Sequence, residues 1–244
     1  MLLPQPQRVG YRIRLSSLNM TDTTNIEVEP AEVLREYGPY PDAQQVHGVT
    51  FDGKHVWIAV GERMLAVAPE SGEITRTLDV PARAGSAFDG QYLYQIASGE
   101  IQKIEPASGR VVGTLPLPRE NVSGMAWADG YLWIGEYTAG KVHQVDPQSG
   151  AIVRSLQSDR FVTGVTWVDG ELWHGAVQHA HDADHALSEL REIDPQSGAV
   201  RRRVAMPKGA YVSGIESNGS DVIYCGGGTS GKLRAVRRSQ RRMP

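Results

Sequence analysis

Residues 122–156 read VSGMAWADGYLWIGEYTAGKVHQVDPQSGAIVRSL and divide into four short segments separated by turn residues. The side chains within these segments follow a period of two, which favours strands over helices. Asp129-Gly130 suits the positive φ angles of a tight hairpin. Pro147 fixes φ at the start of a second turn, and Gly150 closes that turn. We therefore predict four strands at 122–127, 131–136, 141–145 and 151–156.

The same unit recurs along the chain about every 40 residues. Its Asp-Gly or Asn-Gly turn appears at 52–53, 89–90, 129–130, 169–170 and 218–219, and its Pro-x-Ser-Gly turn at 69–72, 106–109, 147–150 and 195–198. Helical solenoids also repeat near this length, but they require a period of 3.6 and few glycines, whereas this chain has 27 glycines. Four strands per repeat are typical of a propeller blade. The fold class predicted is all-β, a five-bladed β-propeller with four-stranded blades.

The two ends of the repeat region complement each other. The fifth copy stops after its third strand, at 233–237, and would leave an unpaired edge. Residues 32–37, upstream of the first copy, resemble the closing strands at 73–78 and 151–156. We therefore predict a ring closed by an N-terminal strand. The expected organisation is a flexible N-terminal extension at 1–25, the five-bladed propeller at 26–238 and a basic tail at 239–244.

Composition narrows the classes of function. A chain of 244 residues with 40% hydrophobic and 22% charged residues is rich enough in apolar side chains to fold. A net charge of −3 argues against nucleic-acid binding, which needs a basic surface. The sequence contains neither an apolar run long enough to span a bilayer nor the pattern of a signal peptide. With one cysteine, Cys225, these features predict a cytoplasmic protein that contacts no membrane.

Residues 31–238 resemble the plant and bacterial type of glutaminyl-peptide cyclotransferase. The resemblance rests on the five repeats closed by an N-terminal strand, on GVTWVDGEL at 164–172 and on the IDPQSG turn at 193–198. It implies a five-bladed propeller that carries a Gln-Gly segment and handles a substrate amine with the glutamates of its Gly-Glu-Gly and Asn-Glu-Leu segments. This chain has VHG at 46–48, GS at 85–86, SG at 123–124 and TG at 163–164 there. The substituted segments argue against true glutaminyl cyclase activity.

The repeats also resemble those of the streptogramin (virginiamycin B) lyases, a seven-bladed family. WIGE at 133–136 followed by GKV at 140–142 is similar to that repeat, and HGVTFDG at 47–53 is similar to its histidine blade. The resemblance implies that His47 is catalytic and that a nearby glutamate helps to hold magnesium. At the place of that glutamate this chain has Gly61, and Glu62 is displaced by one residue.

The mouth of the central channel is the expected place for a site. Aligning the starts of the innermost strands gives His47, Ser86, Ser123, Thr163 and Ser213. Small residues are expected there because five blades crowd the axis, and His47 departs from that pattern. Its imidazole can titrate near neutral pH, so we predict a general acid or base. A hydrogen-bonded histidine that fills a narrow channel is the alternative.

The second strands supply further candidates. Their aligned aromatic residues are Trp57, Tyr94, Trp133, Trp173 and Tyr224; the next positions are Ile58, Gln95, Ile134, His174 and Cys225. Three positions after the aromatic residue, blade 3 has Glu136, whereas the other repeats have small or apolar residues. A salt bridge with Lys141 is the alternative role for this carboxylate. We predict His47, Glu136 and His174 as catalytic residues, with His47 facing Glu136 across the channel. Tyr94, Gln95 and Tyr137 are predicted to contact the substrate.

The fourth repeat is lengthened by VQHAHDADH at 177–185. His179 and His181 share one face of an extended segment, and Asp182 adds an oxygen ligand. Imidazole and carboxylate groups are ligands that zinc accepts. We therefore expect either a divalent metal, zinc or magnesium, bound by these three residues, or no cofactor and a solvated loop.

Two classes of function follow from these features. The first is a small-molecule enzyme with acid/base chemistry at the channel mouth, either lyase-like or cyclotransferase-like. The second is a non-catalytic propeller that binds a small ligand or a partner protein there. Binding platforms favour exposed aromatic residues and arginines. This chain instead places His, Glu and Gln near the mouth, which favours the enzyme.

If His179 and His181 hold a transition metal, replacing both with alanine removes it, because each lost imidazole leaves the ion with one ligand fewer. Elemental analysis of the native protein and the double variant, both purified without a histidine tag, measures the stoichiometry. A native protein that carries no metal would leave the segment as a solvated loop.

Overall fold

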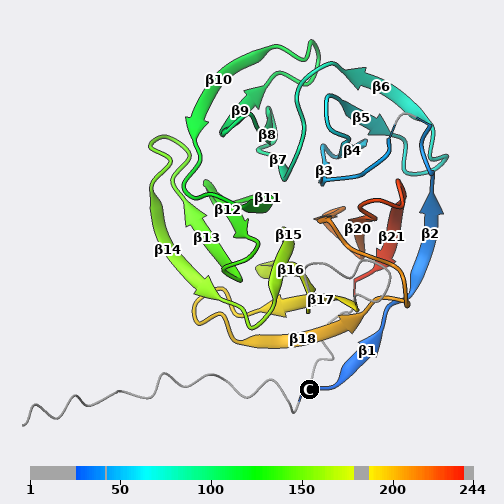
Figure 1. Ribbon diagram of the computed structural model, residues 1–244, viewed down its shortest axis with the longest axis vertical. Helices are drawn as coiled ribbons and strands as arrows, with labels where there is room; N and C mark the ends of the chain where they lie inside the picture. Colours follow the sequence, from blue (N-terminus) through cyan, green and yellow to red (C-terminus); the bar gives the residue numbers. More distant parts are fainter. Residues whose placement is uncertain (1–25, 42, 179–186, 239–244) are drawn as a thin grey trace, which may run out of the picture.

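The computed structural model describes residues 26–41, 43–178 and 187–238. Their strands form five sheets arranged around an axis, which confirms the predicted propeller (Figure 1). Blade 1 contains β3 (Gly48–Phe51), β4 (Val56–Ala59), β5 (Met64–Val67) and β6 (Ile74–Leu78). Blade 2 contains β7 (Ser86–Phe88), β8 (Leu93–Ala97), β9 (Glu100–Ile104) and β10 (Val111–Pro116).

Blades 3 and 4 follow the same order from the axis outward. Blade 3 contains β11 (Val122–Ala128), β12 (Tyr131–Glu136), β13 (Lys141–Val145) and β14 (Ile152–Gln157). Blade 4 contains β15 (Phe161–Val168), β16 (Glu171–Val177), β17 (Ser188–Ile193) and β18 (Val200–Ala205). Asp129 and Gly130, like Asp169 and Gly170, have positive φ angles, as the hairpin turns require.

The N-terminal segment closes the ring, as predicted. Blade 5 contains β19 (Gly214–Ser217), β20 (Val222–Gly226) and β21 (Leu233–Arg237), and its outermost strand is β2 (Val33–Tyr37), which pairs with β21. The sequence did not predict β1 (Val28–Pro30), which adds a fifth, parallel strand to blade 4 beside β18. The segment 28–37 therefore joins the outer edges of two blades (Figure 1).

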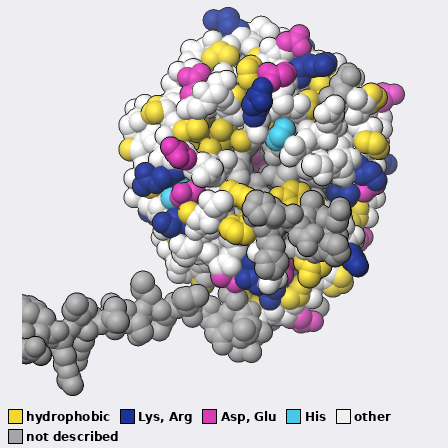
Figure 2. Space-filling view, in the orientation of Figure 1, with side chains coloured by type: hydrophobic (Ala, Val, Ile, Leu, Met, Phe, Trp, Pro, Cys, Tyr) yellow, Lys and Arg dark blue, Asp and Glu magenta, His cyan; other side chains and the backbone are white. Residues whose placement is uncertain are grey.

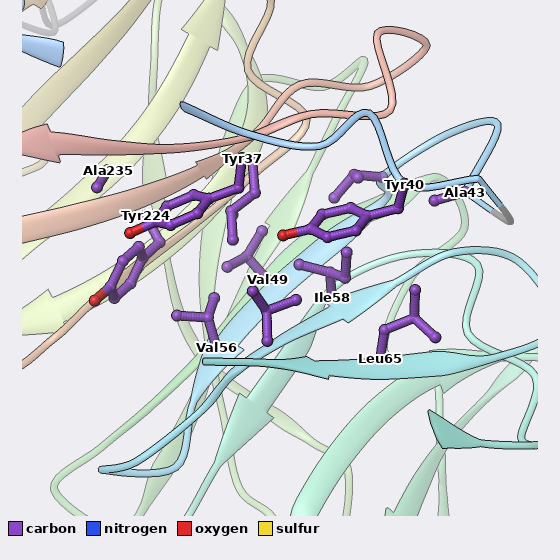
Figure 3. Packing of buried hydrophobic residues seen from close by; sticks show 12 residues of the cluster. Tyr37, Tyr40, Ala43, Val49, Val56, Ile58, Leu65, Tyr224 and Ala235 are labelled. Carbon is purple, nitrogen blue, oxygen red and sulfur yellow. The ribbon is translucent and has the colours of Figure 1, made fainter. Parts of the chain in front are cut away.

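The buried apolar residues form clusters between successive blades. In the cluster between blades 5 and 1, Tyr37 and Tyr40 from the N-terminal segment lie beside Val49 and Ile58 of blade 1 (Figure 3). The hydroxyl of Tyr37 donates a 2.6 Å hydrogen bond to the carbonyl oxygen of Pro69. The closing strand is therefore anchored to blade 1 as well as to blade 5. Among the residues described, none forms a helix long and apolar enough to cross a bilayer.

The innermost strands approach one another through a ring of glycines, one from each blade. The ring consists of Gly48, Gly85, Gly124, Gly164 and Gly214. A Cβ at Gly164 would lie 2.5 Å from Ile215 N, and one at Gly85 would lie 2.6 Å from Gly124 C. None of the five has a positive φ, so glycine is required here by the contact between backbones and not by an unusual conformation.

We expect Gly124→Ala to lower the free energy of unfolding by about 3 kcal/mol, because the new methyl group overlaps the backbone of blade 4. Gly113→Ala is the matched control: it lies in outer strand β10, where nothing stands within 4 Å of the added Cβ. Urea unfolding measures both. Equal stabilities for the two variants would contradict the steric role of the glycine ring.

Candidate functional site

A pocket of about 310 Å³ lies where the inner strands begin, at one end of the central channel. Figure 2 shows a hollow at the centre of the ring, with a histidine side chain beside it. The lining residues come from all five blades and the segments joining them: Gln45, His47, Arg83, Ala84, Asn121, Val122, Ser123, Tyr137, Thr163, Tyr211 and Ser213. We name this pocket the channel-mouth pocket. Of the six described residues that were predicted to be catalytic or to contact the substrate, two, His47 and Tyr137, line it.

His47 is held at the pocket by its backbone and is half-buried. Its N–H donates a 2.8 Å hydrogen bond to the carbonyl oxygen of Ala59, immediately before β3 begins. Burial lowers the pKa of His47, and the positive charge of Arg83 lowers it further. The imidazole is therefore neutral at pH 7 and has a lone pair available to accept a proton. Arg83, largely exposed, forms an ion pair with Glu62.

Two tyrosines, Tyr137 and Tyr211, also line the pocket. Tyr137 follows β12, and its ring centre lies 5.3 Å from that of Phe161. Tyr211 lies in the connection between blades 4 and 5, and burial together with the neighbouring Tyr137 raises the pKa of its hydroxyl. A phenol hydroxyl can donate a hydrogen bond to a ligand. The repeat pattern gave no signal for Tyr211, because it lies outside the repeated unit.

The serine and threonine residues of the pocket use their hydroxyl groups within the protein. Ser123 Oγ donates to Val162 O at 2.6 Å, and Ser213 Oγ donates to Val46 O at 2.5 Å. Both serines therefore tie one blade to the next. Thr163 is 2% exposed, and its Oγ1 has no hydrogen-bond partner among the described residues. This oxygen lies against Gly175 of β16, enclosed by protein, so it supports the packing of blade 4 and is not offered to a ligand.

The structure corrects the alignment of blade 2. Ala84, not Ser86, precedes the axial glycine of that blade and lines the pocket. Ser86 lies two residues further along and is buried, and its Oγ donates a 2.5 Å hydrogen bond to Gln95 Oε1. Aligning the repeats on the glycine that approaches the next blade would have placed Ala84 correctly.

Glu136 does not face His47 across the pocket. Its carboxylate lies 2.9 Å from His143 Nε2, and the other ring nitrogen of His143 lies 2.7 Å from Ser155 Oγ. His143 comes from β13 of the same blade and is 2% exposed. Because Glu136 shares a strand face with Ile134, which packs against blade 2, its side chain lies between the blades. The predicted pairing is therefore replaced by a Glu136–His143 pair, and a catalytic role for Glu136 stays untested.

His174 is also enclosed between blades. It is 0% exposed, with Nδ1 3.0 Å from Gly175 O and Nε2 3.4 Å from Ser158 Oγ. Burial lowers the pKa of His174 to about 4, and the charge of Arg191 contributes. It does not line the channel-mouth pocket. These contacts indicate a neutral histidine that holds blade 4 to the segment preceding it.

Gln95 and Tyr94 are buried away from the channel-mouth pocket as well. Gln95 Nε2 donates to Ala84 O at 3.0 Å, so it supports the backbone of a pocket residue from behind. Tyr94 stacks on Trp127 with ring centres 5.5 Å apart, and its hydroxyl donates to Asp89 at 3.1 Å. Neither side chain reaches the pocket, so both stay unsupported as substrate contacts.

The predicted metal ligands His179, His181 and Asp182 lie outside the described residues. Within the described ranges, no cluster of three or more His, Cys, Asp or Glu side chains could hold a metal ion.

Glu216 on β19 is a candidate that the sequence reasoning missed. Its carboxylate accepts hydrogen bonds from Thr50 Oγ1 at 3.1 Å, Thr166 Oγ1 at 2.5 Å and Ser217 N at 2.9 Å. The two threonines belong to the inner strands of the neighbouring blades, so Glu216 links three blades beside the axis. It lies two residues beyond Gly214, which is about 7 Å further along the channel than the glycine ring.

Burial raises the pKa of Glu216 to about 7, although the hydrogen bonds from Thr166, Ser217 and Thr50 oppose this rise. The folded state therefore binds a proton more tightly than the unfolded chain, whose glutamate has a pKa of 4.5. Because of this difference, the stability that Glu216 confers is complete below pH 4.5 and falls as the pH rises through about 7.

We expect Glu216→Gln to remove this fall in stability with rising pH, because the amide carries no charge at any pH. Relative to the native protein, the variant should gain about 2 kcal/mol of stability between pH 5 and pH 8. Urea unfolding at a series of pH values measures the difference. A stability difference between variant and native protein that is independent of pH would show that Glu216 titrates normally.

The sequence matches no protein-family model and no curated protein. The structure, in contrast, is similar to the crystal structure of Myxococcus xanthus glutaminyl cyclase, with a TM-score of 0.64 and 21% identity over 86% of this chain and 98% of that chain. A chain from the crystal structure of the mitotic checkpoint complex has a TM-score of 0.53 and 11% identity, over 97% of this chain and 100% of that one. These similarities show a shared propeller fold. The resemblance to streptogramin lyases stays a prediction.

Proposed function

We propose that the channel-mouth pocket binds a small polar molecule and that His47 accepts a proton from it. The observation that carries the proposal is a half-buried imidazole of lowered pKa in one pocket with two tyrosines. The imidazole is suited to act as a general base, and the two tyrosine hydroxyls are suited to orient the substrate. The proposed enzyme is lyase-like or cyclotransferase-like.

The substituted segments argue against true glutaminyl cyclase activity, but the similar fold of a glutaminyl cyclase makes a peptide with N-terminal glutamine the first cyclisation substrate to test. In such a cyclisation the terminal amine forms a bond to the side-chain carboxamide carbon, and ammonia leaves. His47 would take the proton from the attacking amine and return it to the departing nitrogen. The phenols of Tyr137 and Tyr211 would donate hydrogen bonds to the oxygen on which negative charge develops.

A non-catalytic pocket that only binds a small ligand is the second candidate. It is favoured by the composition of the lining, because none of the described residues of the pocket is a carboxylate that could assist His47. Saturable binding of a small molecule without turnover would support this candidate.

We expect His47→Ala to lower the rate of ammonia release by about 100-fold while the melting temperature changes little. Arg83→Ala should raise the pKa of His47 and move the acidic limb of the pH–rate profile to higher pH, because it removes a neighbouring positive charge. Arg110→Ala is the matched control, since Arg110 is similarly exposed and paired with Glu105, but outside the pocket. An undiminished rate in His47→Ala, or equal shifts in both arginine variants, would refute the role of His47.

A further inference from the structure

In three blades a cationic side chain lies over the aromatic ring of the second strand. Lys103 Nζ is 5.4 Å from the ring centre of Tyr94 in blade 2. In blades 3 and 4, the guanidinium carbons of Arg154 and Arg202 lie 5.1 Å and 4.7 Å from the ring centres of Trp133 and Trp173. The cation comes each time from the third or fourth strand of the same blade. This arrangement stabilises the cation through the electron-rich face of the ring.

Blade 1 has the ring but not the cation. Trp57 is opposite Ala66 on β5, at the position where Lys103 is opposite Tyr94 in blade 2. Arg76, next in register on β6, turns to blade 2, where its Nη1 donates to Pro106 O at 2.9 Å and Ala107 O at 3.1 Å. Within the described chain, no lysine or arginine therefore takes the place over Trp57.

A cavity of about 740 Å³ is found at this place, and we name it the blade 1 cavity. Asp52, His55, Trp57, Ala66, Thr75 and Arg76 are among its lining residues. It lies beyond the end of β3, whereas the channel-mouth pocket lies at the start of that strand. The two sites are therefore separate.

Blade 2 shows how such a space is filled. Lys103 Nζ lies 3.7 Å from Asp89 Oδ2 and 4.3 Å from the ring centre of Tyr92, in addition to its contact with Tyr94. The residues at the corresponding positions in blade 1 are Asp52, His55 and Trp57. Asp89 accepts a hydrogen bond from Tyr94, and Asp52 accepts one from Trp57 Nε1 at 2.7 Å. The acid and the aromatic ring are thus kept in blade 1, and the lysine is replaced by alanine.

Asp52 carries a negative charge at neutral pH. Burial by itself would raise its pKa, but hydrogen bonds from the backbone of His55, the indole of Trp57 and the backbone of Lys54 lower the pKa overall. The side chain of Asp52 is 14% exposed and that of His55 is 22% exposed. A ligand in the cavity can therefore reach a carboxylate that has no lysine or arginine ion pair among the described residues.

We propose that the blade 1 cavity binds the primary ammonium group of a small molecule, in the place that Lys103 Nζ takes in blade 2. Asp52 supplies the charge, His55 supplies a ring surface, and Trp57, which is 2% exposed, holds Asp52 in place through its indole N–H. Lys54, Glu70 and Arg76 also line the cavity, and the guanidinium of Arg76 is engaged by two carbonyl groups. The remaining volume accommodates the rest of the ligand beyond its ammonium group.

The test is an NMR titration of the full chain with n-butylammonium chloride, observed at the indole N–H of Trp57, which Trp57→Phe assigns. Sodium chloride and n-butanol control for ionic strength and for the alkyl chain. We expect a saturable shift with the amine alone. Ala66→Lys should abolish it, because the new ammonium group fills the site. Asp52→Asn, which keeps an acceptor for the turn, should weaken binding by about tenfold or more.

A gain of binding provides the matched experiment in blade 2. Lys103→Ala opens the equivalent space, so n-butylammonium should raise the melting temperature of this variant more than that of the native protein. His47→Ala should leave the titration unchanged, which separates this site from the channel-mouth pocket. The proposal is overturned if the native protein shows no saturable shift, or if Asp52→Asn binds the amine as tightly as the native protein does.

Discussion

The contact between five backbones at the axis is the constraint on which the rest of this structure depends. With only five blades, each inner strand approaches the next so closely that a Cβ atom has no room at the glycine ring. The residues immediately before these glycines, His47 and Thr163 among them, are thereby brought together around one small opening. Close packing of the backbones thus creates the channel-mouth pocket and sets its width.

The second constraint is that each sheet buries its faces against the neighbouring blades. The apolar clusters lie between blades, so a side chain of a second strand points toward one neighbour or the other. Polar residues on these strands consequently need partners there. Glu136 is hydrogen-bonded to His143, and Gln95 to Ser86. His174 is hydrogen-bonded to a carbonyl oxygen and to a hydroxyl group. Their polarity stabilises the packing of blades and does not by itself indicate a site.

The sequence was sufficient to predict the fold because the repeats carry both period and turn chemistry. It also placed His47 at the mouth, since the residue departs from a pattern of small neighbours. It was less informative where the direction of a side chain decides the outcome: alternation along a strand could not tell whether Glu136 faces the channel or the next blade. Tyr211 and Arg83 lie in connections outside the repeat. Glu216 departs from the threonines Thr50 and Thr166 at the equivalent positions, but the sequence alone does not show that the three side chains meet beside the axis.

The pairing of β2 with β21 joins residues from opposite ends of the propeller, as Val33 lies opposite Val236. During synthesis β2 leaves the ribosome before strands β3 to β20, whereas its partner β21 follows them all. Until then, the strand has exposed backbone groups that can pair with other edges. Contacts so distant in sequence form slowly. Strand β18, with which β1 pairs in parallel, is synthesised before β21. The nascent chain can therefore hold its N-terminal segment against β18 while blade 5 is still being synthesised.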